Sequence, residues 1–218
     1  MQDQRKVAFI TGASSGIGQA LAMSYARAGW DLVLCSATNL GGLRDTTSEC
    51  ERFGVNVLQI QMDVRDREGM KQIRPLVFAK FGRIDVIFAN AGIGGRDYPD
   101  IAKDYETSEL NMETNYFGVL NTVLPFVEDL KNQKSGQIVI SSSISSLRAT
   151  HNSGTYSASK AAVSLWSESL RLRLLPYSVS VTNLIIGFVD TPMNAGLPFR
   201  MPGLISADMA AKKISKAL

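Results

Sequence analysis

Residues 7–18 read Val7-Ala8-Phe9-Ile10-Thr11-Gly12-Ala13-Ser14-Ser15-Gly16-Ile17-Gly18, a short apolar run followed at once by a turn rich in glycine and serine. A helical pattern continues over residues 18–28, so the stretch predicts a strand, a tight turn and a helix. Glycines let such a turn approach a pyrophosphate closely, and the amino end of the helix meets its negative charge. The spacing is Gly-x3-Gly-x-Gly instead of the commoner Gly-x-Gly-x2-Gly. We expect dinucleotide binding by Gly12, Ser14, Ser15, Gly16, Ile17 and Gly18, the alternative being a strand-to-helix turn that happens to be rich in these residues.

The rest of the chain repeats this strand-to-helix order. Apolar, strand-like segments cover residues 7–10, 32–35, 55–62, 84–89, 137–142 and 179–186, and helical patterns cover residues 18–28, 42–52, 67–81, 105–130 and 155–175. Strands this apolar are typical of a parallel sheet covered by helices on both faces. Right-handed crossovers predict a doubly wound sheet, a Rossmann-type α/β fold with strand order 3-2-1-4-5-6. Such sheets bind ligands at the carboxyl ends of their strands, where the glycine turn lies.

The composition is that of one globular domain spanning residues 1–218. The chain is 45% hydrophobic and 20% charged, with a net charge of +3. Its basic residues are spread out, which argues against nucleic-acid binding. We see no signal peptide or membrane span, and Cys35 and Cys50 make no disulfide framework, so we expect a cytoplasmic protein. A single histidine, His151, and the lack of a Cys/His cluster argue against a metal site.

Small and polar residues follow the third and fourth predicted strands. The fourth strand ends in Ala89-Asn90-Ala91-Gly92-Ile93-Gly94, where small side chains leave room for a flat ring or a ribose. Asn90 either lines this site or joins two strand ends through backbone hydrogen bonds, and the two roles are compatible. Asp63-Val64 follows the third strand, and the Asp63 carboxylate either reaches an adenine amino group or caps the next helix. We expect dinucleotide contacts from Asp63, Val64, Asn90, Ala91 and Gly92.

Tyr156 and Lys160 are four residues apart in a predicted helix, so they lie one turn apart on one face. A nearby ammonium favours the phenolate and lowers the pKa of a tyrosine, which would let Tyr156 exchange a proton with a carbonyl oxygen near neutral pH. Ser143, at the end of the fifth strand-like segment, is a candidate to hold the same oxygen. Alone, however, a Tyr-x-x-x-Lys pair is usually a surface contact.

In order and spacing, the chain resembles the short-chain dehydrogenase/reductase family over about residues 6–193. The shared motifs are Thr11-Gly12-x3-Gly16-Ile17-Gly18, Asp63-Val64, Asn90-Ala91-Gly92, Asn115, Ser143 and Tyr156-x3-Lys160. The resemblance implies an enzyme that moves a hydride between a nicotinamide and an alcohol or carbonyl carbon. It also implies four catalytic roles: Tyr156 is the acid/base, Ser143 positions the substrate oxygen, Lys160 binds the nicotinamide ribose and lowers the Tyr156 pKa, and Asn115 holds a water that links Lys160 to solvent.

Two departures from the family pattern concern the cofactor. The family usually has Pro-Gly after the sixth strand, and this chain has Ile186-Gly187, so the turn loses the restraint of proline. We still expect Gly187, Val189 and Thr191 to meet the nicotinamide. The second strand ends in Ser36-Ala37-Thr38-Asn39, with neither an acidic residue to favour NAD nor basic residues to favour NADP. Because Ser36 and Thr38 carry hydroxyl donors, we expect both to contact the cofactor, with a slight preference for NADP over NAD.

Residues 194–218 are expected to form a substrate loop and a last helix capped by Ser206, with no candidate for the family's usual seventh strand. The resemblance also implies a homodimer or homotetramer paired through the helical regions 105–130 and 155–175. His151 either lines the substrate pocket or is an ordinary loop residue. Two other functions stay open. A non-enzymatic dinucleotide sensor would be expected to lose the serine, tyrosine or lysine, and an epimerase or dehydratase on this scaffold is usually longer.

Overall fold

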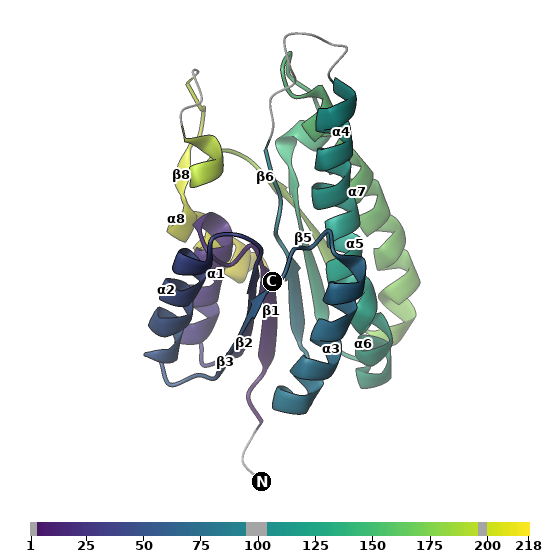
Figure 1. The fold of residues 1–218 in the computed structure, drawn as a ribbon. Helices are drawn as coiled ribbons and strands as arrows, with labels where there is room; N and C mark the ends of the chain where they lie inside the picture. The colour runs from purple at the N-terminus through teal and green to yellow at the C-terminus, as the bar shows by residue number, and fades with distance from the viewer. Residues whose placement is uncertain (1–3, 95–103, 196–199) are drawn as a thin grey trace.

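The computed structural model describes residues 4–94, 104–195 and 200–218, and its centre is a six-stranded parallel sheet (Figure 1). The strands are β1 (Val7–Thr11), β2 (Asp31–Ser36), β3 (Val57–Gln61), β4 (Val86–Ala89), β5 (Gln137–Ser143) and β6 (Ser180–Ile186). Their order is β3-β2-β1-β4-β5-β6, which confirms the predicted doubly wound fold. The order reverses beside β1, so β1 and β4 diverge into their helices on opposite sides of one crevice.

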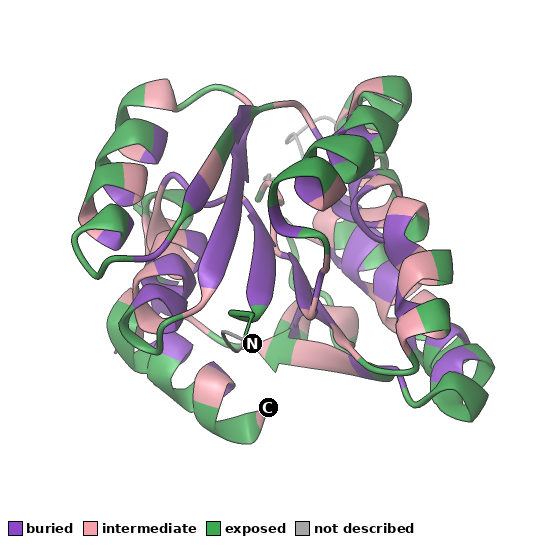
Figure 2. Cartoon of the chain, turned by 90° about the horizontal axis from the view of Figure 1, so that it is seen from below, coloured by how far each residue is buried: buried purple, intermediate pink, exposed green. Residues whose placement is uncertain are grey.

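Helices cover both faces of the sheet (Figure 1). One layer holds α1 (Gly16–Arg27), α2 (Leu40–Glu51) and α8 (Ala207–Ala217), and the other holds α3 (Arg67–Phe81), α5 (Gly118–Val123), α6 (Val127–Gln133), α7 (Gly154–Leu174) and α4 (Asp104–Met112). Alternate residues of a strand point to opposite faces. Accordingly, Val7 and Phe9 join the core under α3 and α7, whereas Ala8 and Ile10 join the core under α1 and α2. Figure 2 shows the central strands as continuously buried, which explains their unbroken apolar sequence.

The predicted helix over residues 105–130 is not one helix. It is broken into α4, a π-helix (Glu113–Phe117), α5, a 3-10 turn (Leu124–Phe126) and α6. Pro125 accounts for the later break, because it has no backbone N–H to continue an α-helix. Insertion of one extra residue per turn makes the π-helix, and this feature often marks functional sites. It places Asn115 in the middle of the irregular turn.

The structure corrects one predicted helix start and one predicted cap. The first helix begins at Gly16, two residues before the predicted start. The helix after β3 is capped by Asp66, whose side chain accepts from Gly69 N at 2.9 Å. Asp63 is therefore not its cap, and that alternative is wrong.

The last part of the chain forms a small second sheet beside α8. Strands β7 (Val189–Asp190) and β8 (Ile205–Ser206) pair in parallel. Ser206 caps α8 as predicted, accepting from Met209 N at 3.2 Å. Part of the predicted substrate loop, residues 196–199, lies outside the described residues. In the described ranges no helix is both long and apolar enough to cross a bilayer.

Candidate active site

The turn between β1 and α1 needs glycine at two positions for steric reasons. Gly12 has a φ of +68° and Gly16 a φ of +56°, a left-handed conformation that costs other residues energy. A Cβ on Gly18 would overlap the carbonyl oxygen of Gly12, and one on Gly12 would lie 3.0 Å from Ala91 Cα. The turn is therefore folded tightly on itself and against the end of β4.

The amino end of α1 keeps its backbone donors clear of a side-chain cap. Ser15 occupies the N-cap position, but its hydroxyl makes no capping hydrogen bond. The first N–H groups of a helix have no partner within the helix, and together with the helix dipole they favour an anion. Ser14 is held in place instead, because its hydroxyl accepts from Ser36 Oγ at 2.9 Å and its carbonyl accepts from Asn39 Nδ2 at 3.3 Å.

Ser36 and Thr38 therefore differ in their environments. Ser36 is buried, and its hydroxyl is already bonded to the glycine turn, whereas Thr38 is exposed at the end of β2. Only Thr38 has a hydroxyl that solvent reaches freely. From the sequence, both residues were expected to contact the cofactor.

Asn90 joins three strand ends, as one of its two proposed roles required. Its Nδ2 donates to Thr11 O at 3.1 Å, and its Oδ1 accepts from Ser141 Oγ at 3.1 Å. The Thr11 hydroxyl accepts from both Asn90 N and Ala91 N at 3.1 Å. These bonds fix the carboxyl ends of β1, β4 and β5 relative to one another, and so fix the floor of the crevice.

Ser143, Tyr156 and Lys160 converge at the end of β5. The Ser143 hydroxyl lies close enough to the Tyr156 phenol to lower its pKa. Lys160 Nζ lies 5.9 Å from the centre of the Tyr156 ring and donates to Ser141 O at 2.8 Å. Gly92 adjoins this group, since a Cβ there would lie 3.4 Å from Lys160 Nζ. Through Ala91 and Gly12 the three polar groups are thus continuous with the glycine turn.

Burial controls the ionisation of both residues on α7. Lys160 is buried, and desolvation lowers its pKa to about 8. Burial also raises the pKa of Tyr156, while Ser143 acts in the opposite direction. The Tyr156 pKa is thus raised overall, opposite to the expected direction, and the group that opposes desolvation is Ser143 and not Lys160. At neutral pH the phenol keeps its proton.

Asn115 is fully buried, and its amide is used by protein groups. Its Oδ1 accepts from Ile93 N at 2.9 Å, and its Nδ2 donates to Ile93 O at 3.0 Å. A Cβ on Gly92 would lie 2.9 Å from Asn115 Oδ1, so the bare glycine separates Asn115 from Lys160. The side chain fixes the loop after β4, beside Lys160.

Asp63 lies at the end of β3 with its carboxylate held by Arg65. Arg65 donates to it from its backbone N at 2.9 Å and from Nη2 at 2.7 Å, and this pairing lowers the Asp63 pKa. Val64 is buried, and its backbone carbonyl accepts from Asn121 Nδ2 at 2.8 Å. Asp63 thus stays ionised, and its carboxylate would contact an adenine while still paired with the guanidinium of Arg65.

The segment after β6 reaches back to the glycine turn. A Cβ on Gly16 would lie 2.9 Å from Thr191 Cγ2. Val189 is buried, its carbonyl accepts from Asn194 Nδ2 at 2.7 Å, and the last β5–β6 pair joins Ser143 to Ile186, directly before Gly187. Gly187 is exposed. The structure therefore brings Val189 and Thr191 to the crevice despite the missing proline.

The family model for short chain dehydrogenase matches residues 6–200. The chain belongs to the short chain dehydrogenase family.

Individual relatives and solved structures align with nearly the whole chain. An uncharacterized oxidoreductase of Myxococcus xanthus (strain DK1622) is 33% identical over 214 residues, which are 98% of this chain and 83% of that protein. The solved alcohol dehydrogenase of the archaeon Thermococcus sibiricus, complexed with 5-hydroxy-NADP, has a TM-score of 0.87 and 30% identity, covering 98% of this chain and 90% of that one. A short chain dehydrogenase/reductase from Burkholderia phymatum in complex with NAD has a TM-score of 0.88 and 26% identity, covering 100% and 86%. Family membership confirms the prediction of an NAD(P)-dependent dehydrogenase or reductase.

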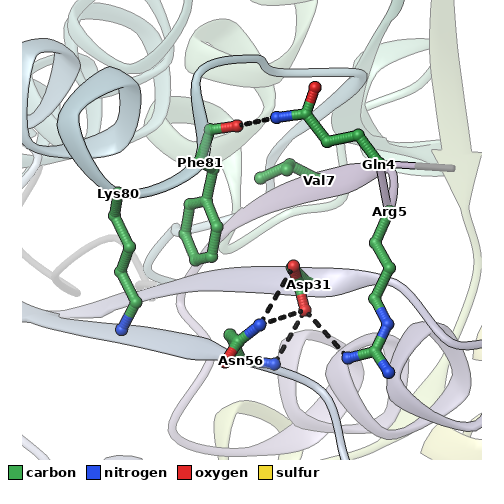
Figure 3. Close-up of a pocket in the computed structure, with 7 residues that line it drawn as sticks. All are labelled: Gln4, Arg5, Val7, Asp31, Asn56, Lys80 and Phe81. Carbon is green, nitrogen blue, oxygen red and sulfur yellow. Dashed lines mark hydrogen bonds and ion pairs between the residues drawn. The ribbon is translucent and has the colours of Figure 1, made fainter. Parts of the chain in front are cut away.

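Two other features lie away from this short chain dehydrogenase crevice. The pocket in Figure 3 has a volume of about 310 Å³ and sits at the amino ends of the strands, opposite the crevice. It is lined by Gln4, Arg5, Val7, Asp31, Asn56, Lys80 and Phe81. His151 is exposed in the loop before α7, where its ring contacts Asn152. Among the described residues, no three His, Cys, Asp or Glu side chains cluster as metal ligands would.

Sequence reasoning missed several polar residues that hold the site together. Thr11 and Ser141 bind Asn90, and Asn111, Thr155 and Ser159 form a buried chain next to Asn115. Each belongs to a residue type that is common in turns and on helix surfaces. The one available signal was the Asn111 and Asn115 pair, since two asparagines one turn apart weaken a helix unless something else requires them.

Proposed function

We propose that this short chain dehydrogenase transfers a hydride between a nicotinamide dinucleotide and an alcohol or carbonyl carbon, with Tyr156 as general acid/base. The observation that carries the proposal is the convergence of Ser143, Tyr156 and buried Lys160, with Lys160 one helical turn from Tyr156 and the glycine turn adjacent. A proton donor, a second hydroxyl and a cation at one point are what a reacting carbonyl oxygen requires.

The residues present fit a dinucleotide. The diphosphate would lie against Gly12, Ser14, Ser15, Gly16, Ile17 and Gly18, where the absent side chains and the uncapped α1 amides favour an anion. Asp63, Val64, Asn90, Ala91 and Gly92 would face the adenosine and ribose groups, with Thr38 and Ser36 at the end of β2. Gly187, Val189 and Thr191 would meet the nicotinamide.

The residues of the chain then divide the work. When bound, the nicotinamide supplies or accepts the hydride. Tyr156 is protonated at neutral pH, since its ordinary pKa of 10.0 is raised further by burial, and it donates its proton to the substrate oxygen in the reductive direction. Ser143 donates a second hydrogen bond to the same oxygen, and Lys160 places a positive charge nearby below about pH 8. Asn115 holds the Gly92–Ile93 loop against Lys160 and lies on the path of proton resupply.

The choice between the two dinucleotides rests on the end of β2. The lack of an acidic residue in Ser36-Ala37-Thr38-Asn39 supports NADP, because no carboxylate repels a 2′-phosphate. Exposed Thr38 supplies a hydroxyl donor, while Ser36 acts through Ser14. NAD remains the alternative, since no cationic side chain ends this strand.

Assembly and organisation form part of the proposal. Large apolar side chains are exposed on α7 and just after it, at Leu165, Leu172 and Leu175, and along α4 to α5 at Tyr105, Leu110 and Phe117. This supports pairing of two copies through these helices, as a homodimer or homotetramer. We further propose a single domain over residues 1–218, with substrate selection in residues 194–218. The proposed location is the cytoplasm, consistent with Cys35 and Cys50, which are both free and buried.

A dinucleotide sensor without catalysis is the main alternative, and an epimerase or dehydratase is the other. The test follows nicotinamide absorbance with 2,3-butanedione, benzaldehyde and cyclohexanone, using NADPH and NADH, for the wild type and Tyr156→Phe. Reduction that falls by about 100-fold or more in Tyr156→Phe supports the proposal. Turnover that is insensitive to the substitution overturns it, and tight cofactor binding without turnover of any carbonyl favours the sensor.

A further inference from the structure

A continuous chain of buried polar side chains joins the π-helix to the first turns of α7. Asn111 Nδ2 donates to Thr155 Oγ1 at 2.9 Å, and Asn115 Nδ2 lies 3.3 Å from Asn111 Oδ1 and 3.1 Å from Ser159 Oγ. The Ser159 hydroxyl then donates to the backbone carbonyl of Tyr156 at 2.7 Å. Asn111, Asn115, Thr155 and Ser159 are all less than a tenth exposed.

The placement of these residues on α7 follows the helical period. Thr155 and Ser159 are four residues apart, and so are Tyr156 and Lys160, so the two pairs form neighbouring rows along the same helix. The first row is bonded to α4 and the π-helix, and the second faces Ser143 and Gly92. Figure 1 shows α4 and α7 side by side. Rotation of α7 about its axis would break the first row and displace the second.

The cost of burying these groups argues that the chain of bonds is specific. Two asparagines weaken the helical region that carries them, and an amide buried without its partner costs about 1–3 kcal/mol. Apolar residues of similar size would pack α4 on α7 without that risk. Polar partners instead fix one rotation of α7 about its axis, because a hydrogen bond tolerates little displacement of its two atoms.

We propose that Asn111 and Thr155 are positioning residues for Tyr156: their buried hydrogen bond sets the rotation of α7 against the helix that carries Asn115. The inference rests on the proposed function, because it assigns a purpose to the setting of Tyr156. A displacement of about 1 Å at a reacting group lowers rates by about 100-fold. The bond therefore acts mainly on turnover, because most of the proposed dinucleotide contacts, at the glycine turn and after β2 and β3, do not lie on α7.

The test compares Thr155→Val, which replaces the hydroxyl with a methyl group, with Thr155→Ser, which keeps the hydroxyl. Thr122→Val is the matched control, because Thr122 is also buried and its hydroxyl bonds only its own helix, to Gly118 O at 2.7 Å. Thr155→Val is expected to lower kcat for the carbonyl panel by about tenfold or more, with the KM for NADPH within about twofold of wild type. Thr155→Ser should recover most of the loss, and Thr122→Val should show none.

A second readout needs no substrate. In NMR spectra of protein labelled with ¹³C at the tyrosine ring, the Tyr156 signal is the one missing from Tyr156→Phe. Its pH titration gives the pKa of the phenol, which depends on the position of the phenol relative to Ser143. Thr155→Val is expected to raise this pKa by about half a unit or more, since the effect of Ser143 that lowers it is weakened. If Thr155→Val matches Thr122→Val in kcat and in this titration, the inference is overturned. If Tyr156→Phe retains full activity, the proposed function itself fails, and the titration still decides the positioning role.

Discussion

Replacing Lys160 by methionine is expected to stabilise the fold at neutral pH while removing activity. Lys160 is only 5% exposed, and burial lowers its pKa to about 8 from an ordinary value of 10.5. The difference corresponds to about 3 kcal/mol that the folded protein loses by holding the charged form at pH 7. Methionine has a similar length and carries no charge, so the variant does not bear this cost.

The sign of the pH dependence follows from which state releases its proton first. Below pH 8 the folded and unfolded forms both carry the lysine proton, and the full cost applies. Between pH 8 and 10.5 the unfolded form binds more protons, so wild-type stability rises with pH. The lysine cost falls to about 1 kcal/mol at pH 10. Loss of the hydrogen bond to Ser141 O subtracts about 1–3 kcal/mol from the gain of the variant at both pH values.

The measured quantity is therefore the change in the stability difference, about 2 kcal/mol between pH 7 and pH 10. Urea unfolding followed by fluorescence of Trp30 and Trp166 gives the free energy of unfolding for both proteins at each pH. The same substitution at exposed Lys212 controls for removal of one positive charge. A stability difference for Lys160→Met that is equal at the two pH values would refute the reasoning, because it would mean that burial does not penalise the charged form.

Two further predictions concern glycines that adjoin the site. Gly92→Ala would place a Cβ 2.9 Å from Asn115 Oδ1 and 3.4 Å from Lys160 Nζ, so we expect a loss of about 1–3 kcal/mol in urea unfolding and a larger fall in kcat than in cofactor affinity; unchanged kcat would contradict it. Gly18→Ala would drive a Cβ into Gly12 O and reshape the turn, so fluorescence titration should show NADPH affinity reduced by about tenfold or more, and wild-type affinity would count against a dinucleotide at this turn.

The sheet was predictable because its signal is local and repeated. Each strand is an apolar run, and each crossover is long enough for a helix, so right-handed crossovers predict a doubly wound sheet, for which 3-2-1-4-5-6 is a common order. Parallel strands then bring Gly12, Asn90 and Ser143 to one edge without any knowledge of contacts. This is why the candidate site residues could be named before their geometry was known.

The irregular helix was less accessible to sequence reasoning. Pro125 gave a usable signal for the 3-10 turn at residues 124–126, but nothing in Glu113–Phe117 distinguishes a π-helix from an α-helix. The extra residue is stabilised by tertiary bonds of Asn115 to Ile93 and Ser159. Such bonds depend on the packing of α4 against α7, which no local pattern encodes.

Ionisation was the other property that sequence could not supply. The Tyr156–Lys160 spacing correctly placed the two groups together, but it led to the wrong direction for the Tyr156 pKa. The pKa depends on the balance between desolvation, which raises it, and Ser143, which lowers it, and burial of this part of α7 comes from α4, the π-helix and β5. Asp66 shows a related limit, since the sequence reasoning considered only Asp63 as the cap of α3, and the structure uses Asp66.

A crystal structure of the protein with NADP⁺, or with NAD⁺ if that binds more tightly, tests the central claim most directly. The account predicts the diphosphate against Gly12–Gly18, Lys160 Nζ within hydrogen-bond distance of the nicotinamide ribose, and the Tyr156 and Ser143 hydroxyls together beside the nicotinamide ring. A dinucleotide bound elsewhere, such as the pocket lined by Arg5 and Lys80, or a nicotinamide ring remote from Tyr156, would contradict it.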